Sequence, residues 1–147
     1  MTLLSTLNDD MKTAMRAKDK ERLAVIRMLK ASLQNEEIKV GHELNADEEL
    51  TILSREMKQR RDSLTEFEKA GRDDLSEKVK VEIAIVEEYL PAQLTDEEIR
   101  DIVKQAIAKT GATSAKEFGK VMSAVMPQVK GKADGNQVNA IVKELLQ

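Results

Sequence analysis

The chain has 147 residues, of which 41% are hydrophobic and 35% charged, and its net charge is −3. This composition is typical of a folded protein with one ordinary domain or two small ones. Cysteine is absent, which excludes disulfides and cysteine nucleophiles. The chain has one histidine, so a Ser-His-Asp triad would have to use it and a zinc site would have only one histidine ligand. Aromatic residues are scarce and good helix formers abundant, so we expect an all-α fold.

Four helices are predicted in residues 1–90, each with apolar residues at steps of three and four. Asp19 is placed to cap the second helix, and Asn45 with Glu48 forms a capping box for the third. The predicted apolar stripes are Leu3, Leu7, Met11 and Met15; then Leu23, Ile26, Leu29 and Leu33, with Ile38 as a further candidate; then Leu50, Leu53, Met57, Leu64 and Phe67; then Leu75, Val79, Ile83, Val86 and Leu90. We interpret this part as an N-terminal helical bundle.

The fourth helix runs into the Leu90-Pro91 step, where proline disfavours helical backbone in the preceding residue. We therefore predict two domains, residues 1–90 and residues 91–147. Three shorter helices are expected in the second domain. Their start signals are the capping boxes Thr95 with Glu98 and Ser114 with Glu117, and the cap Asp134; Pro127 is expected to interrupt the middle helix near its end.

Positive charge gathers in two windows, residues 11–30 and residues 100–132, each with seven basic and two acidic side chains. Such a surface attracts polyanions, although for the first window a solvated surface is the simpler interpretation. In the second window Lys130 and Lys132 flank Gly131, where a bulky anion can approach the backbone closely.

Lys116 and Lys120 lie four residues apart and are expected to share a helix face that extends the charge near Gly131. The predicted RNA-binding residues are Lys116, Lys120, Lys130, Gly131 and Lys132. A merely solvated loop remains the alternative from these residues alone.

Catalytic signals are weak. Most carboxylate clusters fall in the first turn of a predicted helix, where negative charge offsets the helix dipole. Phosphate-binding glycine motifs are missing, and His42 is expected to be a solvated loop residue. We interpret Arg60 and Arg61 as part of a solvent-exposed ion-pair lattice with Glu56, Asp62 and Glu66. No catalytic residue, metal or cofactor is therefore predicted.

Two short segments resemble the signature of the GatB/YqeY family. They are FGKVM at residues 118–122 and KGKAD at residues 130–134. Segments RMLKA at residues 27–31 and EYLP at residues 88–91 are similar to the stand-alone YqeY-like branch, so the likeness covers essentially the whole chain.

The C-terminal tail of this chain resembles the tail of another member of that family, the B subunit of the aspartyl/glutamyl-tRNA amidotransferase. In that subunit the tail helps to hold tRNA. The catalytic cradle of that subunit has no counterpart here. The resemblance implies a non-catalytic module for tRNA or folded RNA, or for a tRNA-handling complex. Two alternatives remain. One is an accessory component of a carbon-nitrogen ligase with glutamine as amide donor, which is the one activity that the family suggests. The other is a structural adaptor.

No base-specific contact is expected, because aromatic residues for stacking are few. No DNA partner is expected either. Membrane association is not expected either, since no stretch approaches the roughly 18 apolar residues that span a bilayer. With no apolar N-terminal signal segment in the sequence, we expect a cytoplasmic location.

Overall fold

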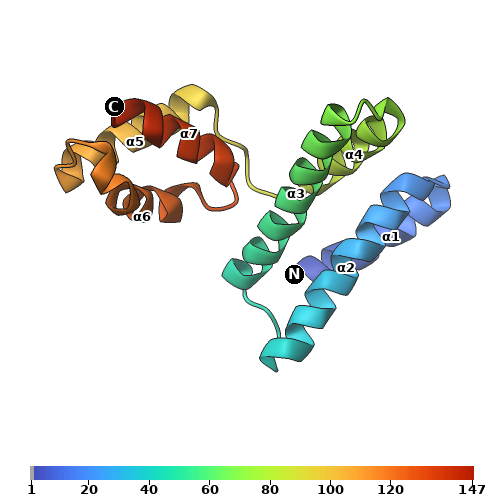
Figure 1. Cartoon of the computed structure of the whole chain (residues 1–147). Coiled ribbons are helices and arrows are strands. Elements are labelled where there is room, and N and C mark those ends of the chain that lie inside the picture. The colour runs from blue at the N-terminus through green and yellow to red at the C-terminus, as the bar shows by residue number, and fades with distance from the viewer. Residues whose placement is uncertain (1) are drawn as a thin grey trace. The chain divides into compact units, whose positions relative to one another are not determined.

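The computed structural model describes residues 2–147, and these residues form α-helices and one 3₁₀ turn without any strand, which confirms the all-α prediction (Figure 1). The chain folds into two compact units, one up to Leu90 and one from Pro91 to Gln147. The elements are α1 (Leu3–Ala17), α2 (Lys20–Val40), α3 (Ala46–Lys69), α4 (Asp73–Glu87), α5 (Asp96–Thr110), η1 (Ala115–Glu117), α6 (Phe118–Val129) and α7 (Gly135–Leu145). Within residues 2–147, no helix is both long and apolar enough to cross a membrane.

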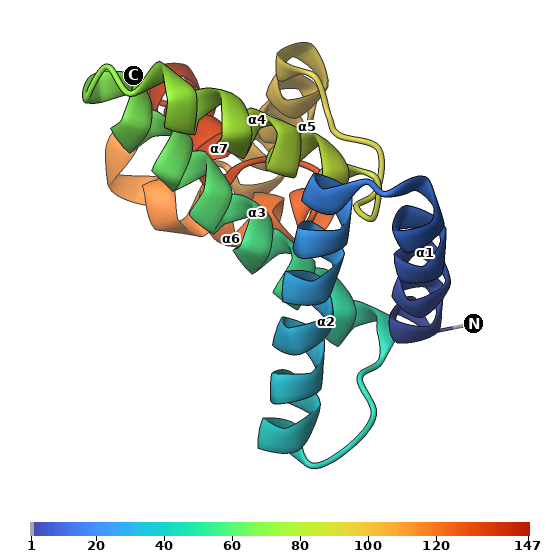
Figure 2. The ribbon, with the colours of Figure 1, turned by 90° about the vertical axis from the view of Figure 1, so that its right-hand side faces the viewer.

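The first unit consists of two helical hairpins, α1 with α2 and α3 with α4, whose apolar faces share one core (Figure 2). Asp19 accepts a hydrogen bond from the backbone N–H of Arg22, and both bonds of the Asn45/Glu48 capping box form. These contacts confirm the predicted helix starts. The fully or nearly fully buried core residues are Leu7, Ala14, Val25, Ile26, Leu29, Leu33, Leu44, Ile52, Leu53, Met57, Ile85 and Val86.

In the second unit α5, α6 and α7 pack against one another around a valine-rich core. The Thr95/Glu98 capping box at the start of α5 is complete, and the Asp134 side chain accepts a hydrogen bond from the backbone N–H of Asn136. The core residues are Ile99, Val103, Ala106, Ala112, Val121, Val125, Val129, Val138, Ile141, Val142 and Leu146.

Two predictions about α6 are wrong. Ser114 makes no capping hydrogen bond with its side chain, and the chain instead enters α6 through the 3₁₀ turn η1. Pro127 does not interrupt the helix, which continues to Val129. A proline in the last turn removes one helical N–H and need not break the helix when its φ is already helical.

Three details of the first unit also differ from the prediction. Met15 is 53% exposed, and Ala14 takes the buried place on α1. Ile38 is 80% exposed and therefore lies outside the apolar stripe of α2. Finally, α4 ends at Glu87 rather than at the proline, because the next residues form tighter i to i+3 turns up to Leu90.

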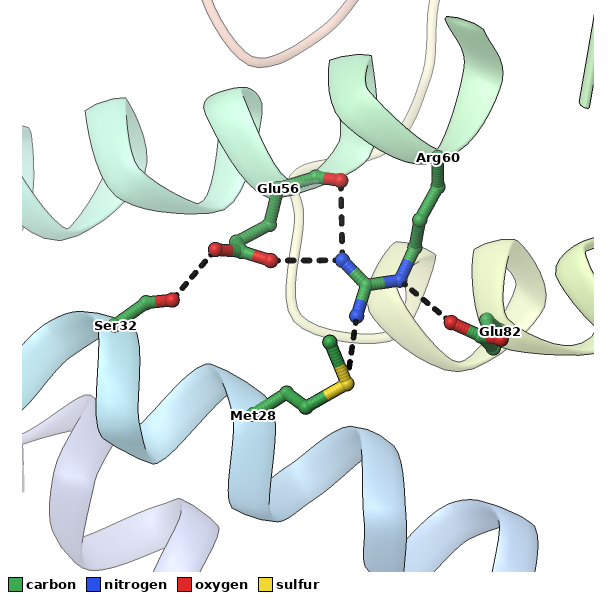
Figure 3. Close-up of polar contacts among 5 residues, drawn as sticks. All are labelled: Met28, Ser32, Glu56, Arg60 and Glu82. Atoms are coloured by element: carbon green, nitrogen blue, oxygen red, sulfur yellow. Dashed lines mark hydrogen bonds and ion pairs between the residues drawn. The ribbon is translucent and has the colours of Figure 1, made fainter. Parts of the chain in front are cut away.

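A buried ionic network joins α2, α3 and α4, and it corrects the interpretation of Arg60 as a surface residue (Figure 3). Arg60 and Glu56 are only 6% and 8% exposed. The Arg60 guanidinium donates to a Glu56 carboxylate oxygen at 2.8 Å, and its Nε lies 3.3 Å from a carboxylate oxygen of Glu82. Ser32 donates to Glu56 at 2.5 Å, and the Met28 sulfur accepts from Arg60 at 3.8 Å.

A second polar cluster ties the end of α4 to the first hairpin. The Tyr89 hydroxyl donates to a carboxylate oxygen of Asp10 at 2.5 Å, and Arg22 forms ion pairs with Asp19 and Glu88. Burial and the hydrogen bond to Asp10 raise the pKa of Tyr89, because both disfavour the phenolate beside a carboxylate.

Candidate nucleic-acid interface

The loop between α6 and α7 is held by hydrogen bonds to the segment that precedes α5. Gly131 has a left-handed backbone (φ 75°), and its carbonyl accepts a hydrogen bond from the Gln93 side chain at 2.9 Å. The Lys132 carbonyl accepts from the backbone N–H of Leu94 at 2.8 Å, while the Lys132 N–H donates to Val129. The loop backbone is therefore fixed, which gives its lysine side chains a defined anchor.

The predicted lysines lie at the two ends of α6. Lys116 in η1 and Lys120 in the first turn of α6 are exposed; at the other end Lys132 is exposed and Lys130 is half-buried. Lys116 and Lys120 do not share one α-helix, since η1 intervenes. At 1.5 Å per residue the two ends are about 15 Å apart along the axis, so no contact joins the two pairs.

The exposed face of α6 between these ends carries no acidic side chain. Residues 118–133 include three lysines and no Asp or Glu, and the exposed positions between the lysines are Ser123, Met126, Pro127 and Gln128. A polyanion that lies along this face would meet positive charge at both ends and no repulsion between them.

Lys143 on α7 was missed by the sequence analysis. Its ammonium nitrogen lies 5.9 Å from the centre of the Phe118 ring, a cation–π geometry. These side chains line a shallow hollow of about 270 Å³ together with Ala115, next to Lys116 in the chain. The two positions are 25 residues apart on different helices, so no spacing rule in the sequence could have linked them.

Arg100 also belongs to the basic window 100–132, but its charge is compensated. Its guanidinium makes two hydrogen bonds to the Glu144 carboxylate at 2.9 and 3.0 Å. The hydrogen bonds and charge of Arg100 lower the pKa of Glu144, and those of Glu144 raise the pKa of Arg100. Arg100 therefore adds little uncompensated charge to the window, whose other basic side chains are lysines.

The basic window 11–30 in the first unit is partly neutralised within the fold. Arg22 is paired with Asp19 and Glu88, and the Lys30 ammonium lies 3.9 Å from the Met11 sulfur. This favours the simpler interpretation of that window as a solvated surface.

The acidic clusters lie where helix capping places them. The first turns of α3, α4 and α5 each carry two or three carboxylates, and His42 is exposed beside Glu48. In the part of the chain that the structure describes, no three His, Asp or Glu side chains are grouped so that they could hold a metal ion.

The lysines suit one kind of chemistry. An ammonium group is a point charge that contacts phosphates without reading bases, and the half-buried Phe118 is covered by Lys143 rather than open for stacking. The arrangement fits the backbone of a folded nucleic acid better than unpaired bases.

Comparison with known protein families gives a match to the family described as Yqey-like protein over residues 4–146. The chain belongs to the YqeY-like family. This confirms the family predicted from the segments at residues 118–122 and 130–134.

The YqeY-like chain is similar to fungal proteins named "Altered inheritance of mitochondria protein 41, mitochondrial". It is 32% identical to that of Pyrenophora tritici-repentis in a match covering 98% of this chain and 81% of the relative. Identity to the Clavispora lusitaniae protein is 34%, over 77% of this chain and 67% of the relative. For Eremothecium gossypii it is 37%, over 60% of this chain and 49% of the relative.

These names contradict the predicted cytoplasmic location, since the relatives are named as mitochondrial proteins. The prediction was wrong because it depended on the lack of an apolar signal segment and of a membrane span. Neither feature specifies a compartment.

Proposed function

We propose that this YqeY-like chain is a non-catalytic helical module that binds tRNA or another folded RNA through Lys116, Lys120, Lys130 and Lys132. The observation that carries the proposal is the acid-free surface of α6, which has lysines at both ends and uncharged side chains between them. RNA phosphates are repeated negative charges, and a face of this kind gains attraction at two places without repulsion in between.

The span of α6 suits a nucleic-acid backbone. Phosphates follow one another along a strand every few ångströms, so two lysine pairs about 15 Å apart can contact the same RNA backbone at two places. The fixed loop backbone around Gly131 supports this role, because side chains on an anchored loop lose less entropy on binding than those on a mobile one.

The test is RNA binding by the double variant Lys130→Ala/Lys132→Ala. If each lost phosphate contact lowers the steepness of the logarithmic salt dependence by roughly 0.7 to 0.9, the variant should bind folded RNAs with a slope shallower by roughly 1.4 to 1.8. All folded RNAs should be affected alike, because the contacts carry no sequence information.

Two controls separate charge from structure. The variant Lys104→Ala/Lys109→Ala removes the same charge from exposed positions of α5 in the same unit and should keep most of the affinity. The variant Lys130→Arg/Lys132→Arg keeps the charge and should restore binding. Circular dichroism checks that the helices persist. Equal losses in the α5 and loop variants, or no RNA binding by the unmodified chain at low salt, would refute the proposal.

The non-catalytic part of the proposal is tested separately. With glutamine, ATP, magnesium and misacylated tRNA, the purified chain is expected to form no amide product. Turnover that follows the protein through purification would contradict it.

A further inference from the structure

Helix α2 is apolar on two opposite sides. One side is buried in the core of the first unit through Val25, Ile26, Leu29 and Leu33. The opposite side also carries apolar residues, of which Met28 and Ile38 are 53% and 80% exposed. Exposed Ala24 and Ala31 lie on that side at seven-residue steps from Ile38, so that a stripe about 21 Å long runs along α2. An exposed apolar stripe of this length is typical of an interaction surface.

The two ends of this stripe differ in shape. At the N-terminal end a hollow of about 110 Å³ opens between α2 and α4, with Ala24, Met28 and Val81 among its apolar walls. At the C-terminal end Ile38 protrudes into solvent. Figure 2 shows α2 along its length beside α1, which packs against a different side of it. A hollow and a protruding side chain thus lie on one helix, fourteen residues apart.

We propose that this face of α2 binds α2 of a second copy of the chain in an antiparallel, two-fold symmetric pair. With Ala31 at the symmetry axis, each Ile38 faces Ala24 of the other copy and enters its hollow. Ala31 meets Ala31 of the second copy, where the small side chains allow the helices to approach closely. Because each copy inserts its Ile38 into the other and receives the other's Ile38, the contact is reciprocal and closes on itself instead of growing into a chain.

The charges along α2 agree with this register. Glu21 beside the hollow faces the helix end that carries Lys39 of the second copy, within about 3 Å along the axis. Arg27 and its equivalent are about 12 Å apart along the axis, with uncharged Asn35 opposite each of them. This register therefore places Glu21 near Lys39 and keeps the two copies of Arg27 apart, while a parallel pair would place Glu21 beside Glu21.

A single helix face is small for an interface, so the dimer should depend on protein concentration. Sedimentation analysis from micromolar concentrations up to about 1 mM should show a monomer that converts to a dimer. The variant Ala31→Glu places two carboxylates at the axis and should abolish the dimer. Its helix content should be unchanged, because Ala31 is exposed.

Cysteine cross-linking tests the register directly, because the chain has no cysteine of its own. A disulfide needs Cα atoms roughly 4.4 to 6.8 Å apart. Under mild oxidation, Ala31→Cys should cross-link with itself. Ala24→Cys should not, because its two copies are about 21 Å apart along the axis. A mixture of Ala24→Cys and Ile38→Cys proteins should give the mixed disulfide.

A matched control is Ala70→Cys, an exposed position after α3 that measures random collision. Cross-linking of Ala31→Cys at the rate of this control would overturn the proposal, as would self-cross-linking of Ala24→Cys, which indicates a parallel pair. A protein that stays monomeric at every concentration would also overturn the proposal, and this face of α2 would then bind a partner of another kind. The outcome is independent of RNA binding, because the tested residues lie in the first unit and the lysines in the second.

Discussion

Replacing Arg60 by alanine should destabilise the first unit strongly. Arg60 is 6% exposed, and its guanidinium compensates the charge of Glu56, which is itself 8% exposed. Breaking a buried ion pair by removing one partner costs about 3 to 5 kcal/mol, because it leaves a charge without compensation. We expect a loss of about 3 kcal/mol in the free energy of unfolding, the lower end of that range, because the Glu82 side chain is 21% exposed and can turn toward water.

The three charged residues of the network should differ in their contributions to stability. Glu82→Ala leaves Arg60 paired with Glu56 and should cost only about 1 kcal/mol. The double variant Glu56→Leu/Arg60→Met removes the buried pair and replaces it with apolar groups of similar size. It should recover much of the stability lost in Arg60→Ala, because desolvating two charges is itself costly.

The assay is urea unfolding followed by tyrosine fluorescence. The chain has one tyrosine and no tryptophan, and Tyr89 packs against the core of the first unit, so this signal reports on that unit alone. Arg61→Ala is the matched control, since Arg61 lies on the same helix with a side chain that is 26% exposed. A loss below about 1 kcal/mol for Arg60→Ala, or one equal to that of the control, would refute the argument for an essential buried charge pair.

Three further predictions concern pH, capping and charge. The folded chain holds the Tyr89 proton more tightly than the unfolded chain, so the free energy of unfolding should fall as pH rises above about 10. Tyr89→Phe removes the hydrogen bond to Asp10 and should weaken this fall, as measured by urea midpoints from circular dichroism. Thr95→Ala should destabilise the second unit by about 1 kcal/mol in chemical denaturation, whereas Ser114→Ala should have almost no effect. Of these two side chains, that of Thr95 caps a helix and that of Ser114 does not. Glu144→Gln frees Arg100 on α5 from its ion pair and should change RNA affinity in filter-binding assays no more than the α5 control variant does; a clear gain in affinity would show that α5 also lies beside the RNA.

Helix starts were predictable where one side chain closes a local hydrogen bond. Asn45 and Thr95 cap their helices as predicted, because the cap requires only residues three positions away. Ser114 has the same pattern with Glu117, but its side chain does not cap, and the chain enters α6 through a 3₁₀ turn. A local pattern thus predicts a possible cap without establishing that it forms.

The candidate site was only partly predictable. The lysines at residues 116–132 were identified from charge and from the glycine between two of them, because these are properties of neighbouring residues. The place of Lys143 over Phe118 and the pairing of Arg100 with Glu144 depend on helices that are far apart in sequence. Only the packing of α7 against α5 and α6 brings these groups together.

The sequence by itself determined that the chain is all-α, where most helices begin and end, and which residues form their apolar faces. These properties follow from backbone hydrogen bonds and from the 3.6-residue repeat, which act over a few residues. Tertiary structure decided the burial of Arg60 in an apolar stripe position between Met57 and Leu64, and it left Met28 and Ile38 on the outer side of α2 largely exposed. Burial depends on which helix faces meet in space. When two faces of one helix are similarly hydrophobic, the sequence of that helix alone does not tell which of them is buried.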